Sequence, residues 1–554
     1  MSAPGIFRPP QPHNEPVLTY APGAPEREVL SKRLRELAGE RIELPLVLGG
    51  EDVSTGDTFE AVMPHRKEHV LADVHQGGPR EVERAIAAAA DAWPDWSRTP
   101  WEERAAVFLR AAELLAGPWR STLNAATMLG QSKTAHQAEI DAACELIDFW
   151  RFNVTFMTRI YEEQPESSPG VWNRLEYRPL EGFVFAVTPF NFTSIAGNLP
   201  TSPALMGNTV VWKPASTSAF SAHFIMRLLQ EAGLPDGVIN LVYGPGAAVG
   251  NAALASPDLA GIHFTGSTPV FQGMWKTVGD SIDHYRNYPR IVGETGGKDF
   301  IVAHPSADVE AVATALVRGS FEYQGQKCSA ASRLYAPSNL WPALRERLIE
   351  EVDSLTMGDV ADFSNFMGAV IDAKALAGHR EAIEHGRREA EILVGGGVDE
   401  SEGFFVEPTV IETRDPHFRL LSEELFGPIL TAYVYPENEW EETLELVDET
   451  APYGLTGAVF ARDREAIDEA SKALEYAAGN FYVNDKPTGA VVGQQPFGGA
   501  RASGTNDKAG SLWNLIRWVS PRTIKETFSP PTDYRYPFLG PEASGDGSRP
   551  PNRP

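Results

Sequence analysis

Short apolar runs alternate with helical stretches from residue 182 onward, and this alternation constrains the fold more than any other feature of the chain. Helical stretches such as 217–233 separate the runs. The first five runs are 182–187, 208–212, 238–243, 261–264 and 299–303. Strands and helices in this order form a doubly wound parallel sheet, which binds ligands outside the carboxyl ends of its strands. The sequence therefore predicts an α/β fold with its site at that edge.

A second alternating segment begins near residue 303 and predicts a second α/β unit. A helix over 309–323 leads into the loop that contains Cys328. Further strands are expected over 333–337, 404–411, 429–435, 455–460 and 479–484. Cys328 therefore lies near the entrance to this second unit.

Four amphipathic stretches precede the first sheet and predict helices over 26–37, 81–93, 102–115 and 137–150. In the last of these, Ile140, Cys144 and Ile147 share one stripe, so Cys144 is expected in the core. Glu139 points away from that stripe, and the pattern by itself predicts a solvated carboxylate.

Composition narrows the classes of function. The 554 residues, 42% apolar and 22% charged, indicate a soluble globular protein of several units. A net charge of −27 disfavours nucleic acid and anionic membrane as main partners. Two cysteines cannot build a disulfide framework, and no apolar stretch approaches the ~18 residues of a membrane span. The N-terminal residues match neither a signal peptide nor a transit peptide, so we expect a cytoplasmic location.

Cys328 is the side chain best suited to covalent chemistry. In GQKCSAASR (325–333) a Gly-Gln turn and Lys327 precede it and small residues follow, so a ligand can approach the sulfur. A free thiol titrates near ~8.5, and a nucleophilic one needs a cation, a helix end or a base to lower that pKa. Lys327 is one candidate cation. The alternative is a small buried hydrophobe, the commonest role of a free cysteine.

Two other loops carry groups that suit the same chemistry. Asn191, in TPFNFT after a predicted strand, can cap a helix or donate to a developing oxyanion. Glu294, in the glycine-rich GETGGKD, is either an ordinary turn carboxylate or a general base. The residue types leave both pairs of alternatives open.

An anionic cofactor has one good candidate loop. In FTGST (264–268), Gly266 and Ser267 follow a strand and can open a helix whose amides face a pyrophosphate. YGPGAAVG (243–250) fits the dinucleotide fingerprint poorly, because its third glycine comes one residue late.

Together these stretches resemble the aldehyde dehydrogenase superfamily. FTGST, ETGGKD, GQKCS, EELFGP and PFGG occur in that family's order, and Glu294 lies 328 − 294 = 34 residues before Cys328, as in its members. Residues 137–153, 320–335 and 479–508 resemble most the branch that oxidises L-glutamate γ-semialdehyde, the open form of Δ1-pyrroline-5-carboxylate, to L-glutamate with NAD+ in proline catabolism.

The resemblance implies the aldehyde dehydrogenase fold, in which a Rossmann-like NAD-binding domain joins a second α/β catalytic domain and a small β oligomerisation flap. The implied ranges are 1–165 and 181–297 for the NAD-binding domain with its N-terminal arm, 298–503 for the catalytic domain, and 166–180 with 504–527 for the flap. Residues 528–554 are proline-rich and polar, and we expect a disordered tail. The flap implies a homo-oligomer, at least a dimer.

The resemblance also implies catalytic roles. The Cys328 thiolate attacks the aldehyde, Asn191 holds the oxyanion, and Glu294 activates the water that hydrolyses the thioester; no metal is implied. The implied cofactor contacts are Lys213, Ser216, Gly266, Ser267, Glu424 and Phe426. Ser216 stands where many NAD-preferring members carry an acidic residue, which leaves NADP as an alternative to NAD.

The implied substrate contacts divide by the chemistry of the amino acid. Ser329 and the backbone amides of Gly489 and Ala490 bind its carboxylate, and Glu139 binds its ammonium group. Phe192 and Phe497 flank the aliphatic chain. Proline dehydrogenase, whose product is the precursor of this substrate, is a candidate partner.

Three other functions remain as alternatives. One is an aldehyde dehydrogenase of different specificity, and another is a cysteine hydrolase in which Cys328 pairs with a histidine such as His379. The third is a non-catalytic NAD-binding protein. A hydrolase forms no NADH, and a non-catalytic protein is indifferent to Cys328→Ala.

Overall fold

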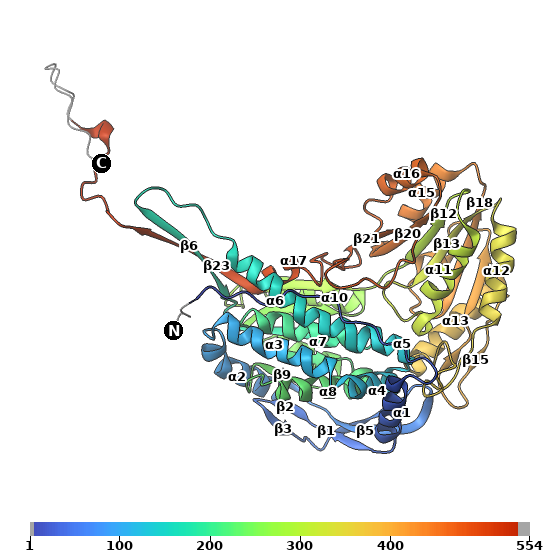
Figure 1. Ribbon diagram of the computed structural model, residues 1–554, viewed down its shortest axis with the longest axis horizontal. Helices are drawn as coiled ribbons and strands as arrows, with labels where there is room; N and C mark the ends of the chain where they lie inside the picture. Colours follow the sequence, from blue (N-terminus) through green and yellow to red (C-terminus); the bar gives the residue numbers. More distant parts are fainter. Residues whose placement is uncertain (1–4, 541–554) are drawn as a thin grey trace.

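Two seven-stranded sheets organise the computed structural model, which describes residues 5–540 (Figure 1). In the first sheet β7 to β11 run parallel, and β2 pairs antiparallel with β9 and β3. Its strands, in sheet order, are β11 (Arg290–Glu294), β10 (Leu259–Thr265), β7 (Phe183–Thr188), β8 (Thr209–Pro214), β9 (Ile239–Leu241), β2 (Leu46–Leu48) and β3 (Glu51–Val53). Four of the five predicted runs form β7 to β10 of this sheet, whereas the fifth, 299–303, belongs to the second sheet, and the sequence pattern missed β2, β3 and β11.

Helices cover both faces of this sheet. The order of the strands reverses after β9, so right-handed crossovers place α7 and α8 on one face and α9 and α10 on the other. The helices of this half are α1 (Pro25–Ala38), α2 (Pro79–Trp96), α3 (Trp101–Ala116), α4 (Arg120–Gln131), α5 (Ala135–Ala138), α6 (Leu146–Glu162), α7 (Thr193–Leu205), α8 (Ala219–Glu231), α9 (Gly246–Leu254) and α10 (Thr268–Asp280), with the 3₁₀ turn η2 (Ser216–Ser218).

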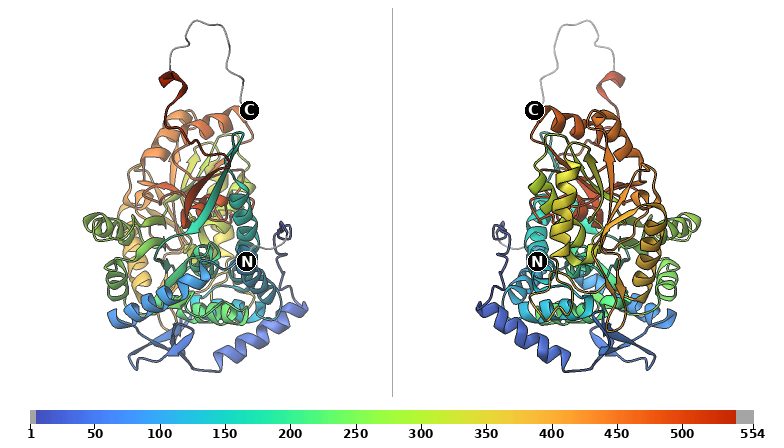
Figure 2. Two further views of the ribbon diagram at one scale, coloured as in Figure 1. Left: turned by 90° about the vertical axis from the view of Figure 1, so that its left-hand side faces the viewer. Right: turned by 90° about the vertical axis from the view of Figure 1, so that its right-hand side faces the viewer.

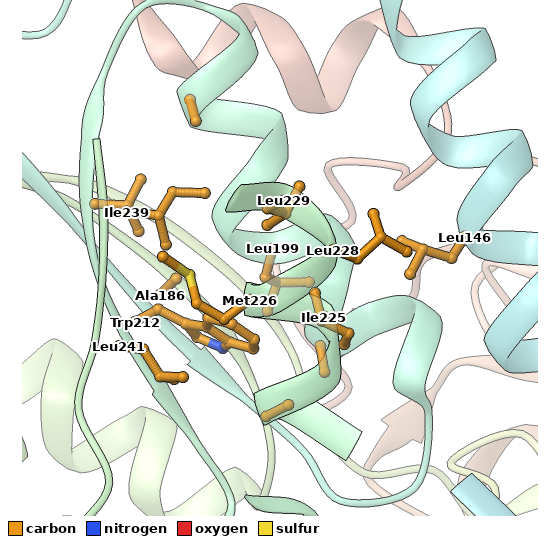
Figure 3. Close-up of a cluster of buried hydrophobic side chains, with 14 of the residues drawn as sticks. Leu146, Ala186, Leu199, Trp212, Ile225, Met226, Leu228, Leu229, Ile239 and Leu241 are labelled. Carbon is orange, nitrogen blue, oxygen red and sulfur yellow. The ribbon is translucent and has the colours of Figure 1, made fainter. Parts of the chain in front are cut away.

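The core between α7, α8 and the sheet is apolar and fully buried (Figure 3). Trp212 of β8 lies at its centre, and Leu199 of α7 and Ile225 of α8 cover it. Its indole N–H donates to Thr188 Oγ1 at 3.0 Å, so the one polar atom of this side chain is satisfied. This packing fixes the strands whose carboxyl ends form the site.

The second sheet is parallel except for its edge strand β14. Its strands, in sheet order, are β14 (Glu391–Val394), β17 (Thr409–Thr413), β18 (Ile429–Tyr435), β13 (Ala331–Pro337), β12 (Asp299–Ala303), β20 (Thr456–Phe460) and β21 (Asn480–Val483). Its helical segments are α11 (Val309–Phe321), η3 (Glu322–Gly325), α12 (Trp341–Asp353), α13 (Ala373–Glu389), α14 (Arg419–Ser422), α15 (Trp440–Glu449) and α16 (Arg464–Ala473). The predicted second α/β unit is therefore present.

A two-stranded ribbon projects from the body. β6 (Val171–Pro179) and β23 (Val519–Thr527) pair antiparallel along their whole length. The left view of Figure 2 looks at this ribbon from its outer end. Residues 528–540 continue beyond β23 and are exposed. The rest of the predicted disordered tail, 541–554, lies outside the described residues.

The remaining elements are short. A three-stranded sheet lies at the base of the first half, and two-stranded pairs occur in the second half. These elements are β1 (Ile42–Leu44), β4 (Thr58–Met63), β5 (Arg66–His75), β15 (Val398–Asp399), β16 (Phe405–Val406), β19 (Tyr453–Gly454), β22 (Ala500–Arg501), α17 (Leu512–Leu515), η4 (Ile516–Trp518) and η5 (Pro537–Leu539). Within residues 5–540, every helix is too short or too polar to cross a membrane.

The helix predicted over 137–150 contains a π-helical segment, η1 (Glu139–Glu145), between α5 and α6. Hydrogen bonds from residue i to i+5 widen the turn, so side chains no longer follow a period of 3.6. Cys144 is buried, as predicted. Glu139 is also fully buried, and the prediction of a solvated carboxylate is wrong.

Candidate active site

A cavity of about 750 Å³ lies between the carboxyl edge of the first sheet and the amino edge of the second. The loops that follow β7, β8, β10 and β11 line one wall, and the turn before β13 and the loop before β18 line the other. The expected site residues among the lining are Asn191, Lys213, Gly266, Ser267, Cys328, Glu424 and Phe426. β7 and β10 are the neighbours at which the strand order reverses, so the cavity has the place predicted for a ligand in a doubly wound sheet.

Cys328 is half-buried in the turn between η3 and β13, and it lines the cavity. The loop before it is rigid. Tyr323 and Gln324 both have left-handed backbones, with φ of 51° and 53°. The Gln324 amide donates to the carbonyls of Ser132 and Ala369 at 3.0 and 2.7 Å, which holds this conformation. The sulfur is therefore presented by a fixed backbone.

The pKa of the Cys328 thiol is raised well above its ordinary value by burial and by nearby carboxylates. The carboxylates are Asp299, Glu424, Glu294 and Glu145. Lys327 does not offset them, because its ammonium group pairs with Glu322 at 3.1 Å. The prediction that Lys327 lowers the thiol pKa is wrong. A thiol in this environment is neutral at rest, and its proton needs an acceptor when it attacks.

Asn191 is buried three residues after β7 and lines the cavity with Cys328. Its amide nitrogen donates to the Gln326 carbonyl at 3.2 Å. The N-terminus of α7 follows directly, and Asp141 accepts from the backbone N–H groups of Thr193 and Ser194, each at 2.9 Å. Asp141 therefore caps α7 and fixes the segment that carries Asn191.

Glu294 is the last residue of the edge strand β11 rather than part of a turn. One carboxylate oxygen accepts from the Gly499 N–H at 3.3 Å, and a Cβ at Gly498 would lie only 2.8 Å from the other. Burial raises the pKa of this carboxyl well above its ordinary value, which makes it a stronger base. Glu294 is not among the lining residues, but Thr295 and Gly296 are, so rotation of its side chain brings it toward the cavity.

The cavity wall formed by the first sheet suits a dinucleotide. Gly266 and Ser267 immediately precede α10, whose N-terminal amides can bind a pyrophosphate. Gly246, Gly250 and Gly273 also line the cavity, and nothing lies within 4 Å of the Cβ that each lacks. The backbone is thus open to a large ligand, and the residues present fit the expected cofactor.

Lys213 and Glu424 are the two ionisable residues expected to bind ribose hydroxyls. Burial lowers the pKa of Lys213 to about 8 and raises that of Glu424 to about 6. Glu424 also accepts from the Gly297 N–H at 2.9 Å. Phe426, with φ of 55°, packs edge-on against Phe190 at 5.7 Å. Ser216 is exposed at the start of η2 and lies outside the lining, next to the lining residue Ala215.

The expected substrate residues gather around the nucleophile loop. The hydroxyls of Ser329 and Thr488 lie 2.8 Å apart, which holds the Gly489–Ala490 loop beside the residue that follows Cys328. Phe497 directly precedes Gly498, the residue packed against Glu294. These contacts bring the predicted carboxylate site next to the sulfur.

Phe192 lies on an ionic cluster. The Lys133 ammonium is 4.4 Å from the centre of the Phe192 ring and 4.4 Å from that of Tyr323, and 2.6 Å from Asp141. Lys133 is fully buried, so these contacts replace its hydration. The cluster fixes the position of the Phe192 ring.

Glu139 does not belong to this group. Its carboxylate accepts from Arg120, from the Tyr20 hydroxyl and the Asn124 amide at 2.8 Å each, and from the Leu18 N–H at 2.8 Å. Burial favours a raised pKa, but these bonds outweigh it and hold the pKa of Glu139 below its ordinary value. With its oxygens occupied, Glu139 is not available for a substrate ammonium group, and the predicted role is wrong.

Glu145, which the sequence analysis missed, lies at the other end of the same π-helical segment. It accepts from Ser194 Oγ at 2.9 Å, and its charge acts on the Cys328 thiol. Burial, followed by the Asp141 charge, raises its pKa to about 8. A signal existed: Asp141, Glu145 and Asp148 form an acidic stripe at i, i+4 and i+7 on an otherwise apolar helix, which is rare without a function.

The profile of the aldehyde dehydrogenase family matches residues 52–524. The chain belongs to this family. It is 51% identical over 529 residues to the mitochondrial Δ1-pyrroline-5-carboxylate dehydrogenase of Bos taurus, covering 95% of this chain and 94% of that protein. It is 50% identical over 535 residues to the mitochondrial enzyme of the same name from Dictyostelium discoideum, covering 96% of each.

Solved structures agree with the sequence relatives. The Δ-pyrroline-5-carboxylate dehydrogenase of Mycobacterium tuberculosis bound with NAD superposes with a TM-score of 0.94 at 55% identity, covering 97% of this chain and all of that one. Proline utilization A from Bdellovibrio bacteriovorus superposes with a TM-score of 0.89 at 29% identity, and this aldehyde dehydrogenase chain matches 54% of its length. The expected aldehyde dehydrogenase fold is confirmed.

The expected cytoplasmic location is contradicted. The Bos taurus and Dictyostelium discoideum relatives are named as mitochondrial proteins, and they share about half of their residues with this aldehyde dehydrogenase. Targeting is read from address signals by receptors, so the composition of a folded enzyme does not determine its compartment.

Proposed function

We propose that this aldehyde dehydrogenase oxidises L-glutamate γ-semialdehyde, the open form of Δ1-pyrroline-5-carboxylate, to L-glutamate with NAD+ in proline catabolism. The observation that carries the proposal is the surroundings of Cys328. It lines the cofactor-type cavity, Ser329 directly after it contacts Thr488, which precedes Gly489, and the Glu145 carboxylate is close enough to raise the pKa of its thiol. The named relatives support the same substrate.

The reaction begins at Cys328. Its sulfur forms a bond to the aldehyde carbon, the thiol proton passes to a nearby carboxylate, and the carbonyl oxygen becomes an oxyanion. The Asn191 amide and the Cys328 backbone N–H donate to the oxyanion. These hydrogen bonds are strongest in the transition state, where the negative charge develops on the oxygen.

NAD+ supplies the acceptor for the hydride that leaves the substrate carbon when the oxyanion collapses to a thioester on Cys328. Lys213 and Glu424 would bind ribose hydroxyls, and the amides after Gly266 would bind the pyrophosphate. Phe426 would lie beside the nicotinamide ribose. Ser216, at the rim, carries no charge to repel a 2′-phosphate, which leaves NADP as an alternative.

Glu294 completes the turnover. It takes a proton from water, the water oxygen adds to the thioester carbon, and collapse expels the Cys328 sulfur with the carboxylic acid as product. The expelled thiolate recovers its proton from the carboxylate that held it, and Glu294 releases the water proton to solvent. Its side chain would turn from its contact with the Gly499 N–H toward the cavity, which the next residues, Thr295 and Gly296, already line.

The head group of the substrate requires both signs of charge. Ser329 with the amides of Gly489 and Ala490 would bind its carboxylate, since a left-handed glycine, here with φ of 97°, presents backbone N–H groups to an anion. Glu145 would bind its ammonium group in place of Glu139. Phe192 and Phe497 would flank the aliphatic chain between the two ends.

The proposal extends to assembly. Residues 1–165 with 181–297 would bind the cofactor, 298–503 would supply the nucleophile, and 166–180 with 504–527 would join subunits. The β6–β23 ribbon supports a homo-oligomer, at least a dimer, because an isolated two-stranded ribbon is only marginally stable in water. The match to proline utilization A supports a proline dehydrogenase as the partner that supplies substrate.

A substrate panel tests the proposal. Glutamate semialdehyde, succinate semialdehyde and propanal are each supplied with NAD+ and with NADP+, and reduced cofactor is followed by absorbance. The proposal expects the highest kcat/KM with glutamate semialdehyde and NAD+. A preference for another aldehyde would contradict it. A cysteine hydrolase is disfavoured, because no histidine within residues 5–540 lines the cavity, and His379 binds the Leu425 carbonyl instead.

A further inference from the structure

The N-terminal arm, residues 6–24, has no helix or strand and crosses α6 and α4 before it enters α1 (Figure 1). Polar contacts hold it in place. Glu15 pairs with Arg120 at 2.6 Å and with Arg151 at 2.7 Å, and its backbone N–H donates to Asp148 at 2.7 Å. The Glu139 carboxylate holds the next part of the arm at Leu18 and Tyr20. The arm is therefore a specific part of the fold rather than a loose extension.

Both the nitrogen and the oxygen of the Asn14 side-chain amide form hydrogen bonds, and these bonds join three segments of the chain. Its nitrogen donates to Asp148 Oδ2 at 2.8 Å and to the Val492 carbonyl at 2.8 Å. Its oxygen accepts from the Gln494 amide at 2.9 Å. One side chain thus joins the arm, α6 and the loop that contains Val492.

The two segments joined by Asn14 are the ones that would hold the substrate head group. Val492 and Gln494 continue the loop that begins at Gly489 and Ala490, the expected carboxylate site. Asp148 lies three residues, almost one helical turn, after Glu145, the expected ammonium site. Asn14 therefore links the segment of the expected carboxylate site to the segment of the expected ammonium site.

Packing against α6 leaves the loop no spare room. Gly493 has φ of 82°, and a Cβ there would lie 2.1 Å from the Phe152 ring. Val492 packs within 3.3 Å of the Cβ position of Gly510. The loop rests directly on α6, so the direction of its backbone depends on the bonds made to the Val492 carbonyl and the Gln494 side chain.

We infer that Asn14 is a positioning residue for substrate specificity: it fastens the carboxylate-binding loop to the helix that carries Glu145, and so sets the spacing at which an α-amino acid head group is recognised. This inference rests on the proposed function. It also assigns Glu139 a role, since that carboxylate anchors the arm from which Asn14 extends.

Steady-state kinetics of Asn14→Ala test the inference, with Thr19→Ala as the matched control. Thr19 lies in the same arm and is exposed, and its hydroxyl has only two long contacts, with Glu26 and with the Ala21 N–H, each at 3.4 Å. Asn14→Ala should raise KM for glutamate semialdehyde about tenfold, the effect of losing one or two hydrogen bonds. Its kcat, its KM for NAD+ and its kcat/KM for propanal, which has no head group, should stay within about twofold of the wild type. Thr19→Ala should match the wild type throughout.

The double variant Asn14→Asp with Asp148→Asn distinguishes the effect of the bond to the loop from the effect of the bond to α6. The swap restores an amide–carboxylate bond between the arm and α6, but it leaves the Val492 carbonyl without its donor. KM for glutamate semialdehyde should therefore remain raised. Full recovery would show that only the arm–helix bond matters and would overturn the inference.

Other outcomes are equally decisive. Equal losses of kcat/KM on glutamate semialdehyde and propanal, or no change on either, would refute a head-group role for Asn14. Should Asn14→Ala fail to fold, the swapped pair carries the same comparison. A wild-type enzyme inactive toward glutamate semialdehyde would refute the proposed function itself, which is a separate result from an active wild type with an unaffected variant.

Discussion

Glu139 and Glu145 begin and end one π-helical segment and have opposite surroundings. Glu139 is ion-paired with Arg120 beneath the N-terminal arm, and its pKa is held low. Glu145 has no cationic side chain within hydrogen-bond or ion-pair distance in the described residues, its pKa is raised to about 8 by burial, and its charge acts on Cys328. One carboxylate is therefore structural, and the other is left to bind a cation.

The Glu145→Gln variant should lose recognition of the substrate ammonium group. We expect KM for glutamate semialdehyde to rise about 10- to 100-fold, the usual effect of removing a charge-assisted hydrogen bond. The kcat/KM for propanal should change little, because propanal has no ammonium group. Parallel losses on both aldehydes would instead show that Glu145 supports the reacting centre.

The Glu139→Ala variant should lose stability, and a loss on glutamate semialdehyde should accompany this only through release of the arm that carries Asn14. Removal of Glu139 takes away one of the two carboxylates that pair with Arg120 and leaves the Tyr20 hydroxyl without its acceptor, which costs about 3 to 5 kcal/mol of the free energy of unfolding. Urea denaturation followed by circular dichroism measures this loss. A fully stable variant with a selective loss on glutamate semialdehyde would restore the substrate role that the structure argues against.

Asn191→Ala should slow the chemical step. Loss of one oxyanion donor reduces kcat by about 10²- to 10³-fold. KM for NAD+ should be unchanged, because the amide is expected to face the substrate oxygen rather than the cofactor. Pre-steady-state formation of NADH is the measurement, and a normal burst would exclude Asn191 from oxyanion stabilisation.

Cofactor binding should depend on pH through Glu424. Its pKa of about 6 means that the carboxyl is ionised above that pH and can accept from ribose hydroxyls. As pH falls through about 6 it becomes protonated, so the Kd for NAD+ should rise. Calorimetric titration from pH 5 to 8 tests this, and Glu424→Gln should bind more weakly with no such transition. The same transition in both proteins would place its origin elsewhere.

The sequence predicted the large features because they depend on periodicity and order. Alternating runs predicted the parallel strands of both sheets, and the rule that ligands bind at the carboxyl ends of parallel strands predicted the edge at which the cavity lies. The strands β2 and β3 have only three residues each, and β11 ends in Gly293 and Glu294, which resemble a turn. Such strands form because neighbouring strands complete their hydrogen bonds, which local sequence does not reveal.

The errors at the site arose from tertiary contacts. The expected position of the Glu139 side chain assumes an α-helix of about 3.6 residues per turn. A π-helical segment and the distant Arg120 determine its surroundings instead. Lys327 is adjacent to Cys328 in sequence, but its ammonium group pairs with Glu322. In the first case the ionic partner is distant in sequence, and in the second the left-handed backbone of Tyr323 and Gln324 brings a residue five positions away onto Lys327.

The central claim is that the Cys328 sulfur carries the acyl group of the substrate after the hydride has left. Glu294→Gln should stall at this stage, because the amide cannot take a proton from water. We therefore propose to mix this variant with glutamate semialdehyde and NAD+, quench with acid, and map the mass of each cysteine peptide. The account predicts a glutamyl adduct on the peptide of Cys328, dependent on NAD+, and none on buried Cys144. An unmodified Cys328 in a variant that has formed one equivalent of NADH would contradict it.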